Sequence, residues 1–331
     1  MKPIYLFGVV AGIVVIAFGH ITDPIPTPPP WFPAMTIPDD NALTPERWAL
    51  GKRLFFDKAL SKDSTLACAS CHNPAFAFAD TVAFSLGIGH KIGTRNAPTL
   101  ANIGYAPYFH ADGSHATLEM QVHGPIENEA EFNDNLNAVS ERLAADQTYQ
   151  RQSQAAYQNI LNPDIIARAL SCYERTILSG YARFDRYQQE EDYTLNDAEM
   201  RGKDLFFSAE LGCARCHFGK FFTDFGFYNV GLYTDYADKG LSNITKDEAD
   251  IGKFKTPTLR NIAITAPYMH DGSMQTLEQV MQHYATNGKN HPNRSHKMTQ
   301  FNITSEQKTD VIAFLQTLTD TAFLSNPALS N

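Results

Sequence analysis

Two short clusters of cysteine and histidine carry the clearest chemistry in this sequence. They share the pattern Cys-x-x-Cys-His, at Cys68, Cys71 and His72 and again at Cys213, Cys216 and His217. This pattern is the signature for covalent attachment of c-type haem. Two thiols three residues apart lie on one helical turn and can bond the two vinyl groups of a porphyrin. The histidine that follows can bind the iron from one face, so the sequence predicts two haems with His72 and His217 as proximal ligands.

Two other kinds of site share part of this pattern. A Cys-x-x-Cys pair alone is also found in redox dithiols and in zinc sites. Neither alternative needs the trailing histidine, and neither explains two copies in one chain. The fifth cysteine, Cys172, stands alone in a predicted helix and is expected to be a small buried hydrophobic residue.

The two clusters belong to a longer internal repeat. Matching segments occur in the same order in both halves: 51–56 with 202–207, 68–72 with 213–217, 97–100 with 256–259, 106–110 with 266–270, and 112–119 with 271–278. The period is about half of the chain, which indicates a two-copy domain duplication and not a solenoid.

The elements that position these clusters are predicted to be helices. Thr44-Pro45 and Asn162-Pro163 each place a capping residue before a proline at a first helical position. Capping boxes pair Asn196 with Glu199 and Thr304 with Gln307. Apolar residues between 164 and 180 recur at helical spacing, and no region alternates strictly between apolar and polar residues. We therefore expect a mainly α protein with two cytochrome c-like haem domains, long ordered loops and little sheet.

Length and charge limit the class of protein further. A chain of 331 residues suits two domains. We expect an N-terminal haem domain over 41–190 and a C-terminal haem domain over 191–325. The formal net charge of -9 argues against a nucleic-acid partner and favours attraction of a basic protein, which a salt-dependent rate would test.

The N-terminus has the pattern of an export segment. Lys2 precedes an apolar run of 16 residues over 4–19, and small residues at Ala17 and Gly19 suit cleavage by a signal peptidase. The run is shorter than the roughly 20 residues that span a bilayer, so a cleaved signal is preferred to an uncleaved inner-membrane anchor. Both alternatives place the folded part outside the cytoplasm, in the periplasm. Residues 20–40 follow as a proline-rich linker.

The haem motifs and the segments around them resemble the bacterial di-haem cytochrome c peroxidase family, including its MauG-like members. The resemblance extends from Leu43 to Leu318. Besides both Cys-x-x-Cys-His sites it includes the segments 89–99, 121–131 and 266–272. The resemblance implies that peroxide reacts at the N-terminal haem and that the C-terminal haem receives electrons.

The resemblance also assigns residues around the N-terminal haem. His90 matches a distal histidine that occupies the iron in many resting enzymes, and the glycine-rich loop 87–93 would move it away. Glu131 matches the catalytic carboxylate and Gln121 a nearby amide. Cleavage of an O–O bond needs a group that moves a proton between the two oxygens, which suits Glu131. Glu127 and Glu129 are the alternatives on the same segment.

Around the C-terminal haem the sequence departs from the common family pattern. The position that usually holds a distal methionine is Tyr284 here, as in MauG-like members. A phenolate ligand favours ferric and higher oxidation states, whereas methionine raises the haem potential. Met298 and His283 are the alternative ligands.

Two further features follow from the resemblance. The family often has a tryptophan between the haems, but Ala111 occupies that position, and Tyr108 or Phe109 is left to fill the space. Members also hold a calcium ion between the domains, and Asn96, Thr265 and Pro267 match its oxygen ligands. Family members are commonly homodimers.

These observations lead to one expected activity and two alternatives. We expect a periplasmic di-haem peroxidase that reduces hydrogen peroxide to water with electrons from a small c-type cytochrome or a similar donor. The first alternative is a MauG-like oxidase that acts on side chains of a partner protein, which Tyr284 favours. The second is a non-enzymatic electron carrier, against which Glu131 and the glycine-rich loop argue.

Overall fold

The computed structural model describes residues 25–190 and 193–331, so the predicted export segment lies outside the described residues. None of the described helices combines the length and apolar character needed to span a bilayer. The α-helices of the described chain are α1 (Pro45–Phe56), α2 (Cys68–Cys71), α3 (Leu118–Gln121), α4 (His123–Glu127), α5 (Leu136–Ala144), α6 (Gln147–Tyr157), α7 (Pro163–Glu174), α8 (Arg183–Gln188), α9 (Asp197–Phe206), α10 (Ser242–Thr245), α11 (Leu277–Ala285), α12 (Ser305–Gln316) and α13 (Thr321–Leu324).

Sheet is minimal, which confirms the predicted mainly α class. Strands β1 (Phe227–Tyr228) and β2 (Phe254–Lys255) form one antiparallel pair, with Phe227 opposite Lys255. The long segments between helices are loops and short turns. The predicted ordered loops are therefore present around both Cys-x-x-Cys-His clusters.

The predicted capping residues begin four of the longer helices. The Thr44 and Asn162 side chains accept from the backbone N–H of Arg47 and Ile165 at the starts of α1 and α7. Full capping boxes begin α9 at Asn196 and α12 at Thr304. Helix α7 ends at Glu174, earlier than the apolar spacing up to residue 180 suggests, although Ile177 is still fully buried in the turn that follows.

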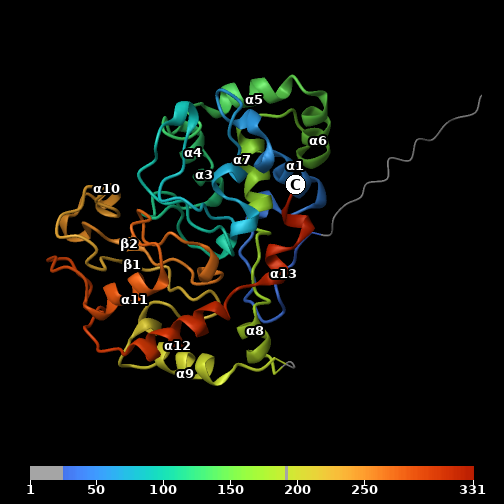
Figure 1. The fold of residues 1–331 in the computed structure, drawn as a ribbon. Helices are drawn as coiled ribbons and strands as arrows, with labels where there is room; N and C mark the ends of the chain where they lie inside the picture. The colour runs from blue at the N-terminus through green and yellow to red at the C-terminus, as the bar shows by residue number, and fades with distance from the viewer. Residues whose placement is uncertain (1–24, 191–192) are drawn as a thin grey trace, which may run out of the picture.

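Two helix pairs repeat the same close packing. A Cβ at Gly51 of α1 would lie 1.9 Å from the carbonyl oxygen of Ala169 in α7, and a Cβ at Gly202 of α9 would lie 1.9 Å from that of Asp310 in α12. The backbones of each pair therefore touch where the glycine allows it. In Figure 1 the α1/α7 pair and the α9/α12 pair lie at opposite ends of the molecule.

Each helix pair has its own hydrophobic core. The first core contains the buried faces of α1, α5 and α7, and the second those of α9, α11 and α12. The chain crosses between them, because Phe184 of α8 packs in the second core while Phe323 and Leu329 near the C-terminus return to the first. Figure 1 shows this return, with α13 and the C-terminus close to α1. The division of the chain between 190 and 191 stays a prediction.

The structure corrects the register of one segment of the repeat. Phe109 bridges to His115 in the first half, and Tyr268 bridges to Met274 in the second. His110 and Met269 both have positive φ, at 62° and 72°. His110 therefore corresponds to Met269, one residue away from the pairing with His270 that the sequence match suggests.

Candidate functional site

Both Cys-x-x-Cys-His clusters form single helical turns. Cys68–Cys71 is the short helix α2, and Cys213–Arg215 is a 3-10 turn. In each cluster the N–H of the histidine donates to the carbonyl of the first cysteine, at 2.9 and 3.0 Å. This geometry places the two thiols and the histidine on one short turn, as the spacing predicts.

None of the four thiols has the environment of a redox dithiol. All four are free, and burial raises the pKa of each, to about 11 for Cys213 and Cys216. Reactive dithiols instead have a lowered thiol pKa. The environment therefore suits thiols that become thioethers more than thiols that cycle between oxidation states.

The two histidines are held alike by a backbone carbonyl. Nδ1 of His72 lies 3.0 Å from the carbonyl oxygen of Phe78, and Nδ1 of His217 lies 3.0 Å from that of Phe222. This contact places the proton on Nδ1 and leaves the lone pair of Nε2 for a metal. Burial lowers the pKa of both imidazoles, which keeps them neutral and able to ligate.

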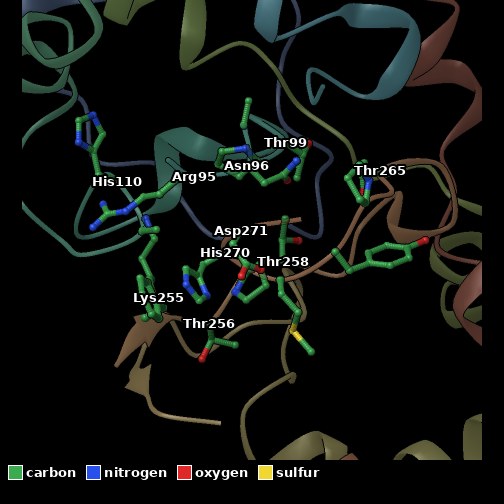
Figure 2. Close-up of a pocket in the computed structure, with 18 of the residues that line it drawn as sticks. Arg95, Asn96, Thr99, His110, Lys255, Thr256, Thr258, Thr265, His270 and Asp271 are labelled. Atoms are coloured by element: carbon green, nitrogen blue, oxygen red, sulfur yellow. The ribbon is translucent and has the colours of Figure 1, made fainter. Parts of the chain in front are cut away.

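One continuous cavity of about 1230 Å³ reaches both clusters. It is lined by all four thiols, by His72 and His217, and by apolar side chains from both cores. Figure 2 shows Arg95, Asn96, Thr99 and His110 from the first half facing Lys255, Thr256, Thr258 and Thr265 from the second. Pockets for single small ligands usually measure about 300–1,000 Å³. The volume therefore suits more than one small ligand.

The predicted catalytic pair lines this cavity. Gln121 at the end of α3 and Glu131 after α4 are both half-buried lining residues, whereas Glu127 and Glu129 are exposed and do not line it. Burial raises the pKa of Glu131, although Asn128 donates a hydrogen bond of 2.8 Å to Oε1. The structure therefore brings together Cys68, Cys71, His72, Gln121 and Glu131.

The structure does not bring His90 into the cavity. His90 is exposed on a 3-10 turn in which Gly89 and His90 have φ of 61° and 59°, and it is not among the lining residues. The loop is joined to the catalytic segment, because the N–H of Ile88 donates to the carbonyl of Glu131 at 3.0 Å. Iron ligation by His90 stays a prediction and requires this loop to move.

The second half of the cavity contains two of the three candidate distal ligands. Tyr284 on α11 and Met298 both line it. His283 does not, and its Nε2 lies 2.9 Å from the carbonyl oxygen of Val230. Burial raises the pKa of Tyr284, so the phenol is protonated at neutral pH unless a cation binds it. The assignment of Tyr284 stays a prediction.

The residues expected at the calcium site also line the cavity. Asn96, Thr265 and Pro267 approach from the two halves, and the N–H of Asn96 donates to the carbonyl of His270 at 2.9 Å. Among residues 25–190 and 193–331, no group of three or more His, Cys, Asp and Glu side chains forms a metal site. A calcium site at Asn96 would instead rest on amide and carbonyl oxygens.

Comparison with known proteins shows the family. The model of the di-haem cytochrome c peroxidase family matches residues 45–193. The methylamine utilization protein MauG of Methylorubrum extorquens is 35% identical over 285 residues, which cover 85% of this chain and 80% of that protein. The chain belongs to the di-haem cytochrome c peroxidase family. Membership in this family implies two c-type haems.

Other di-haem peroxidase relatives cover a similar part of the chain. The cytochrome c551 peroxidase of Nitrosomonas europaea is 33% identical, over 84% of this chain and 82% of its own. The crystal structure of a MauG-like protein associated with microbial copper homeostasis matches this one with a TM-score of 0.87 and 34% identity, over 91% of this chain and 97% of that one. The fold is therefore that of the di-haem peroxidases throughout.

The residues present fit two haems. Cys68, Cys71 and His72 would hold one, and the equivalent residues of the second half would hold the other. Haem also carries carboxylate groups, which cationic side chains can bind. Arg95 and Lys255 are two such side chains that line the cavity near the boundary between the halves. Arg95 forms ion pairs of 2.7 and 2.6 Å with Asp112 and Asp238, and burial lowers the pKa of Lys255 to about 8.

Sequence reasoning missed several lining residues. Glu174 at the end of α7 is 7% exposed, and its Oε2 has no hydrogen-bond partner. His110 also lines the cavity, at 3.4 Å from Gln121. One available signal was the contrast between the repeats, because histidines at 110 and 115 have methionines at the equivalent positions of the second half.

Neither tryptophan of the chain lines the cavity. Of the two residues expected to fill the space of the missing tryptophan, Phe109 lines the cavity and Tyr108 is 47% exposed.

Proposed function

We propose that this protein is a periplasmic di-haem peroxidase that reduces hydrogen peroxide to water with electrons from a small c-type cytochrome. The observation that carries this proposal is the asymmetry of the cavity. Glu131 and Gln121 line it, and Glu131 lies near enough to the Cys68 and Cys71 thiols to raise the pKa of both. The equivalent of Gln121 in the second half is the apolar Val280. A partly desolvated carboxyl paired with an amide suits a reaction with peroxide at the first haem site and electron transfer at the other.

The chain supplies proton transfer and positioning at this site. When bound, the N-terminal haem supplies the iron at which peroxide is reduced. Glu131 is partly desolvated, and its raised pKa lies closer to neutral pH, where a carboxyl can both accept and release a proton. Asn128 holds Oε1 at 2.8 Å and fixes the orientation of the carboxyl. Gln121 also lines this cavity and would supply an amide suited to hydrogen-bond peroxide.

The decisive experiment is peroxide turnover with reduced cytochrome c by the holoenzyme and by Glu131→Gln. We expect a loss of at least about 100-fold in the variant, because general acid–base catalysis contributes at least that much. Glu129→Gln is the matched control, since Glu129 is exposed and does not line the cavity. No turnover by the parent protein would refute the peroxidase proposal, and an equal rate in Glu131→Gln would refute the role of Glu131.

A second candidate function is oxidation of a partner protein in the manner of MauG. Tyr284 favours it, because the aromatic hydroxyl lines the cavity of the electron-transfer half and a phenolate ligand stabilises high oxidation states. The 35% identity to the methylamine utilization protein MauG also supports it. Consumption of peroxide without any oxidation of reduced cytochrome c would favour this candidate. Glu131 argues against a third possibility, a carrier without enzymatic activity.

Location and partners complete the proposal. The proposal of export to the periplasm depends on residues 1–19. The choice between a cleaved signal and a membrane anchor depends on the same residues, which lie outside the described part of the chain. The net charge of -9 suits a basic cytochrome donor, whose rate would then fall with rising ionic strength. A calcium ion on Asn96, Thr265 and Pro267 and assembly into a homodimer are proposed from the family resemblance.

A further inference from the structure

A hydrogen-bonded row of side chains leads outward from the peroxide side of the cavity. Nε2 of His110 lies 3.4 Å from Nε2 of Gln121, and its Nδ1 lies 3.1 Å from Oγ of Ser114. The same Oγ lies 3.0 Å from Nδ1 of His115. The two imidazole rings meet edge to face at 4.6 Å between centroids. The inner end of the row, at His110 and Gln121, lines the cavity.

The outer end of the row is close to solvent. His115 is half-buried, and the pKa of its imidazole is lowered by burial and by nearby His123. The His123 side chain is 48% exposed, and its Nδ1 lies 3.1 Å from Oε1 of Glu127, which is also exposed. The outer end of the row is therefore partly open to solvent at His115, and the exposed His123–Glu127 pair lies near it without a direct hydrogen bond to it.

The row is absent from the second half of the molecule. His110 and Met269 both have positive φ and therefore correspond to each other. The bridges from Phe109 to His115 and from Tyr268 to Met274 likewise pair His115 with Met274. Gln121 corresponds to Val280, and only Ser114 has a polar counterpart, Ser273. The shared backbone therefore accepts methionine at both histidine positions. The histidines are not needed to form this turn, and they occur only at the site where the proposed reaction consumes protons.

The surroundings give the two rings room and keep them neutral. Gly124 of α4 provides the room, because a Cβ there would lie 2.5 Å from Cε1 of His110 and 3.6 Å from Cε1 of His115. The charged groups that face His110 are Asp112, Arg95 and Lys255, together with His115 itself. Burial, with a smaller effect of His115, lowers the pKa of His110 to about 4.

We infer that His115, Ser114 and His110 form a proton relay that delivers protons from the surface to the Gln121–Glu131 side of the cavity. The inference rests on the proposed peroxidase function. Reduction of one hydrogen peroxide to two waters takes two electrons from the donor and two protons from solvent. Both protons must cross the protein wall, and the row provides a path of groups that each donate and accept.

The proton balance of the relay closes without any group gaining a net charge. A proton binds Nε2 of His115 as the proton on its Nδ1 passes to Oγ of Ser114. The hydroxyl proton of Ser114 passes to Nδ1 of His110, and the proton on Nε2 of His110 leaves toward the cavity. Each imidazole ends in its other tautomer, and the serine ends as a hydroxyl. In the final arrangement Nε2 of His110 can accept from the Gln121 amide, which matches the 3.4 Å contact.

The test compares Ser114→Ala with Ser114→Thr. It also compares His115→Ala in buffer without imidazole and in buffer with imidazole. Each holoenzyme is first checked by absorption spectroscopy for two attached haems. We measure proton uptake with a pH indicator during a single turnover and the solvent deuterium isotope effect on steady-state peroxide turnover. Ser114→Ala and His115→Ala should take up protons at least about tenfold more slowly. Ser114→Thr should recover most of the loss, and imidazole should rescue His115→Ala.

The outcomes separate the relay from the peroxidase function. A parent enzyme that does not consume peroxide overturns both. An active parent whose Ser114→Ala and His115→Ala variants keep its proton-uptake rate and isotope effect overturns the relay alone. Equal losses in Ser114→Ala and Ser114→Thr, with no rescue by imidazole, also overturn the relay, because they indicate a structural role for the two side chains.

Discussion

At the scale of single residues, the two halves differ mainly in what surrounds otherwise equivalent histidines. His72 and His217 have the same backbone partner geometry, with Nδ1 at 3.0 Å from a carbonyl oxygen. The difference lies in other residues that line the cavity, where Glu131 lies near the thiols of the first site and Tyr284 near those of the second. If His72 and His217 are the proximal ligands as predicted, these other side chains distinguish the chemistry of the two haems.

Tyr284→Met tests the distal ligand of the second site. If Tyr284 binds iron, we expect the absorption and electron paramagnetic resonance spectra of one haem to change, and its reduction potential to rise, because a thioether favours the reduced iron more than a phenolate does. Met298→Leu is the control, since Met298 lines the same part of the cavity. Unchanged spectra in Tyr284→Met, with a change in Met298→Leu, would assign the ligand to Met298.

Glu174 makes a second prediction at this scale. Burial raises the pKa of its carboxyl to about 8, and its Oε2 has no hydrogen-bond partner. The unfolded chain loses this proton near pH 4.5, so the folded state should lose stability as pH rises from about 4.5 to 8. Gly51 packs on Ala169 in the first helix pair, and Gly202 packs on Asp310 in the second, so Ala169 and Asp310 hold equivalent positions. Five residues further along each helix, Leu315 is therefore the counterpart of Glu174.

Glu174→Leu should therefore flatten this pH dependence and stabilise the protein by up to a few kcal/mol at pH 8, less at pH 5. The measurement is the urea midpoint of the holoenzyme at both pH values. Glu210→Leu, at an exposed position, serves as the control. Parallel pH profiles for the parent and Glu174→Leu would contradict the prediction.

At the scale of elements, close helix packing depends on a glycine in each half. Because a Cβ at Gly51 or Gly202 would lie 1.9 Å from a backbone oxygen of the partner helix, neither helix pair can accept a methyl group without moving apart. The turn that carries each haem motif follows the first helix of its pair. The spacing of the two helices thus helps to define the wall of each haem site.

Gly51→Ala and Gly202→Ala should each destabilise the protein by about 1–3 kcal/mol, the usual cost of overpacking a well-packed interface. The gain in helix propensity on replacing glycine, under about 1 kcal/mol, offsets only part of this. Gly93→Ala is the control, because the nearest heavy atom to its Cβ would be 3.8 Å away. Thermal midpoints measure the effect, and equal midpoints for all three variants would show that the helices adjust freely.

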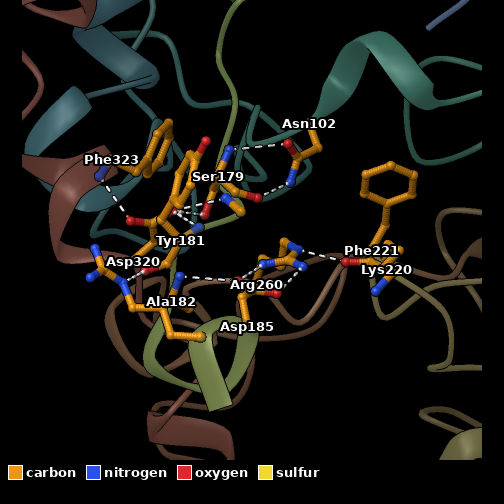
Figure 3. A network of polar contacts seen from close by, with 12 residues as sticks. Asn102, Ser179, Tyr181, Ala182, Asp185, Lys220, Phe221, Arg260, Asp320 and Phe323 are labelled. Carbon is orange, nitrogen blue, oxygen red and sulfur yellow. Dashed lines mark hydrogen bonds and ion pairs between the residues drawn. The ribbon is translucent and has the colours of Figure 1, made fainter. Parts of the chain in front are cut away.

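At the scale of the whole molecule, the two halves are joined by a buried polar network. The Asp320 carboxylate accepts from the backbone N–H of Gly180 and Tyr181, both at 2.8 Å, and so fixes the segment between α7 and α8. Nearby, Arg260 and Asp185 form a bidentate ion pair at 2.7 and 2.8 Å, with side chains only 1% and 3% exposed. Figure 3 shows the two clusters side by side at this junction.

Asp185→Ala should destabilise the protein by about 3–5 kcal/mol, because it leaves the buried Arg260 guanidinium without its counter-ion. The control is Asp164→Ala, which removes an exposed partner of Arg168 and should cost less than about 1 kcal/mol. Denaturant unfolding measures both. If the two variants lose similar stability, the buried pair does not secure the junction.

The sequence by itself determined the haem motifs, the duplication, the capped helices and the scarcity of sheet. The motifs, the caps and the scarcity of sheet depend on residues close in sequence, whose spacing sets local geometry directly, and the duplication is visible when the two halves are compared. Thr44, Asn162, Asn196 and Thr304 all begin helices as predicted. The placement of Gln121 and Glu131 came from family resemblance, and the structure brings both to the cavity wall.

Only the tertiary structure decided which side chains share one cavity and which do not. His90, the expected distal ligand, is exposed, whereas His110 and the unpartnered Glu174 line the wall. The register between Phe109 and Tyr268 required the bridges that each forms across its turn. The shared cavity and the burial of Glu174 arise from contacts between residues far apart in sequence, which local spacing does not encode. The row of His110, Ser114 and His115 is local in sequence, but its place at the cavity wall appears only when the two halves close around a common cavity.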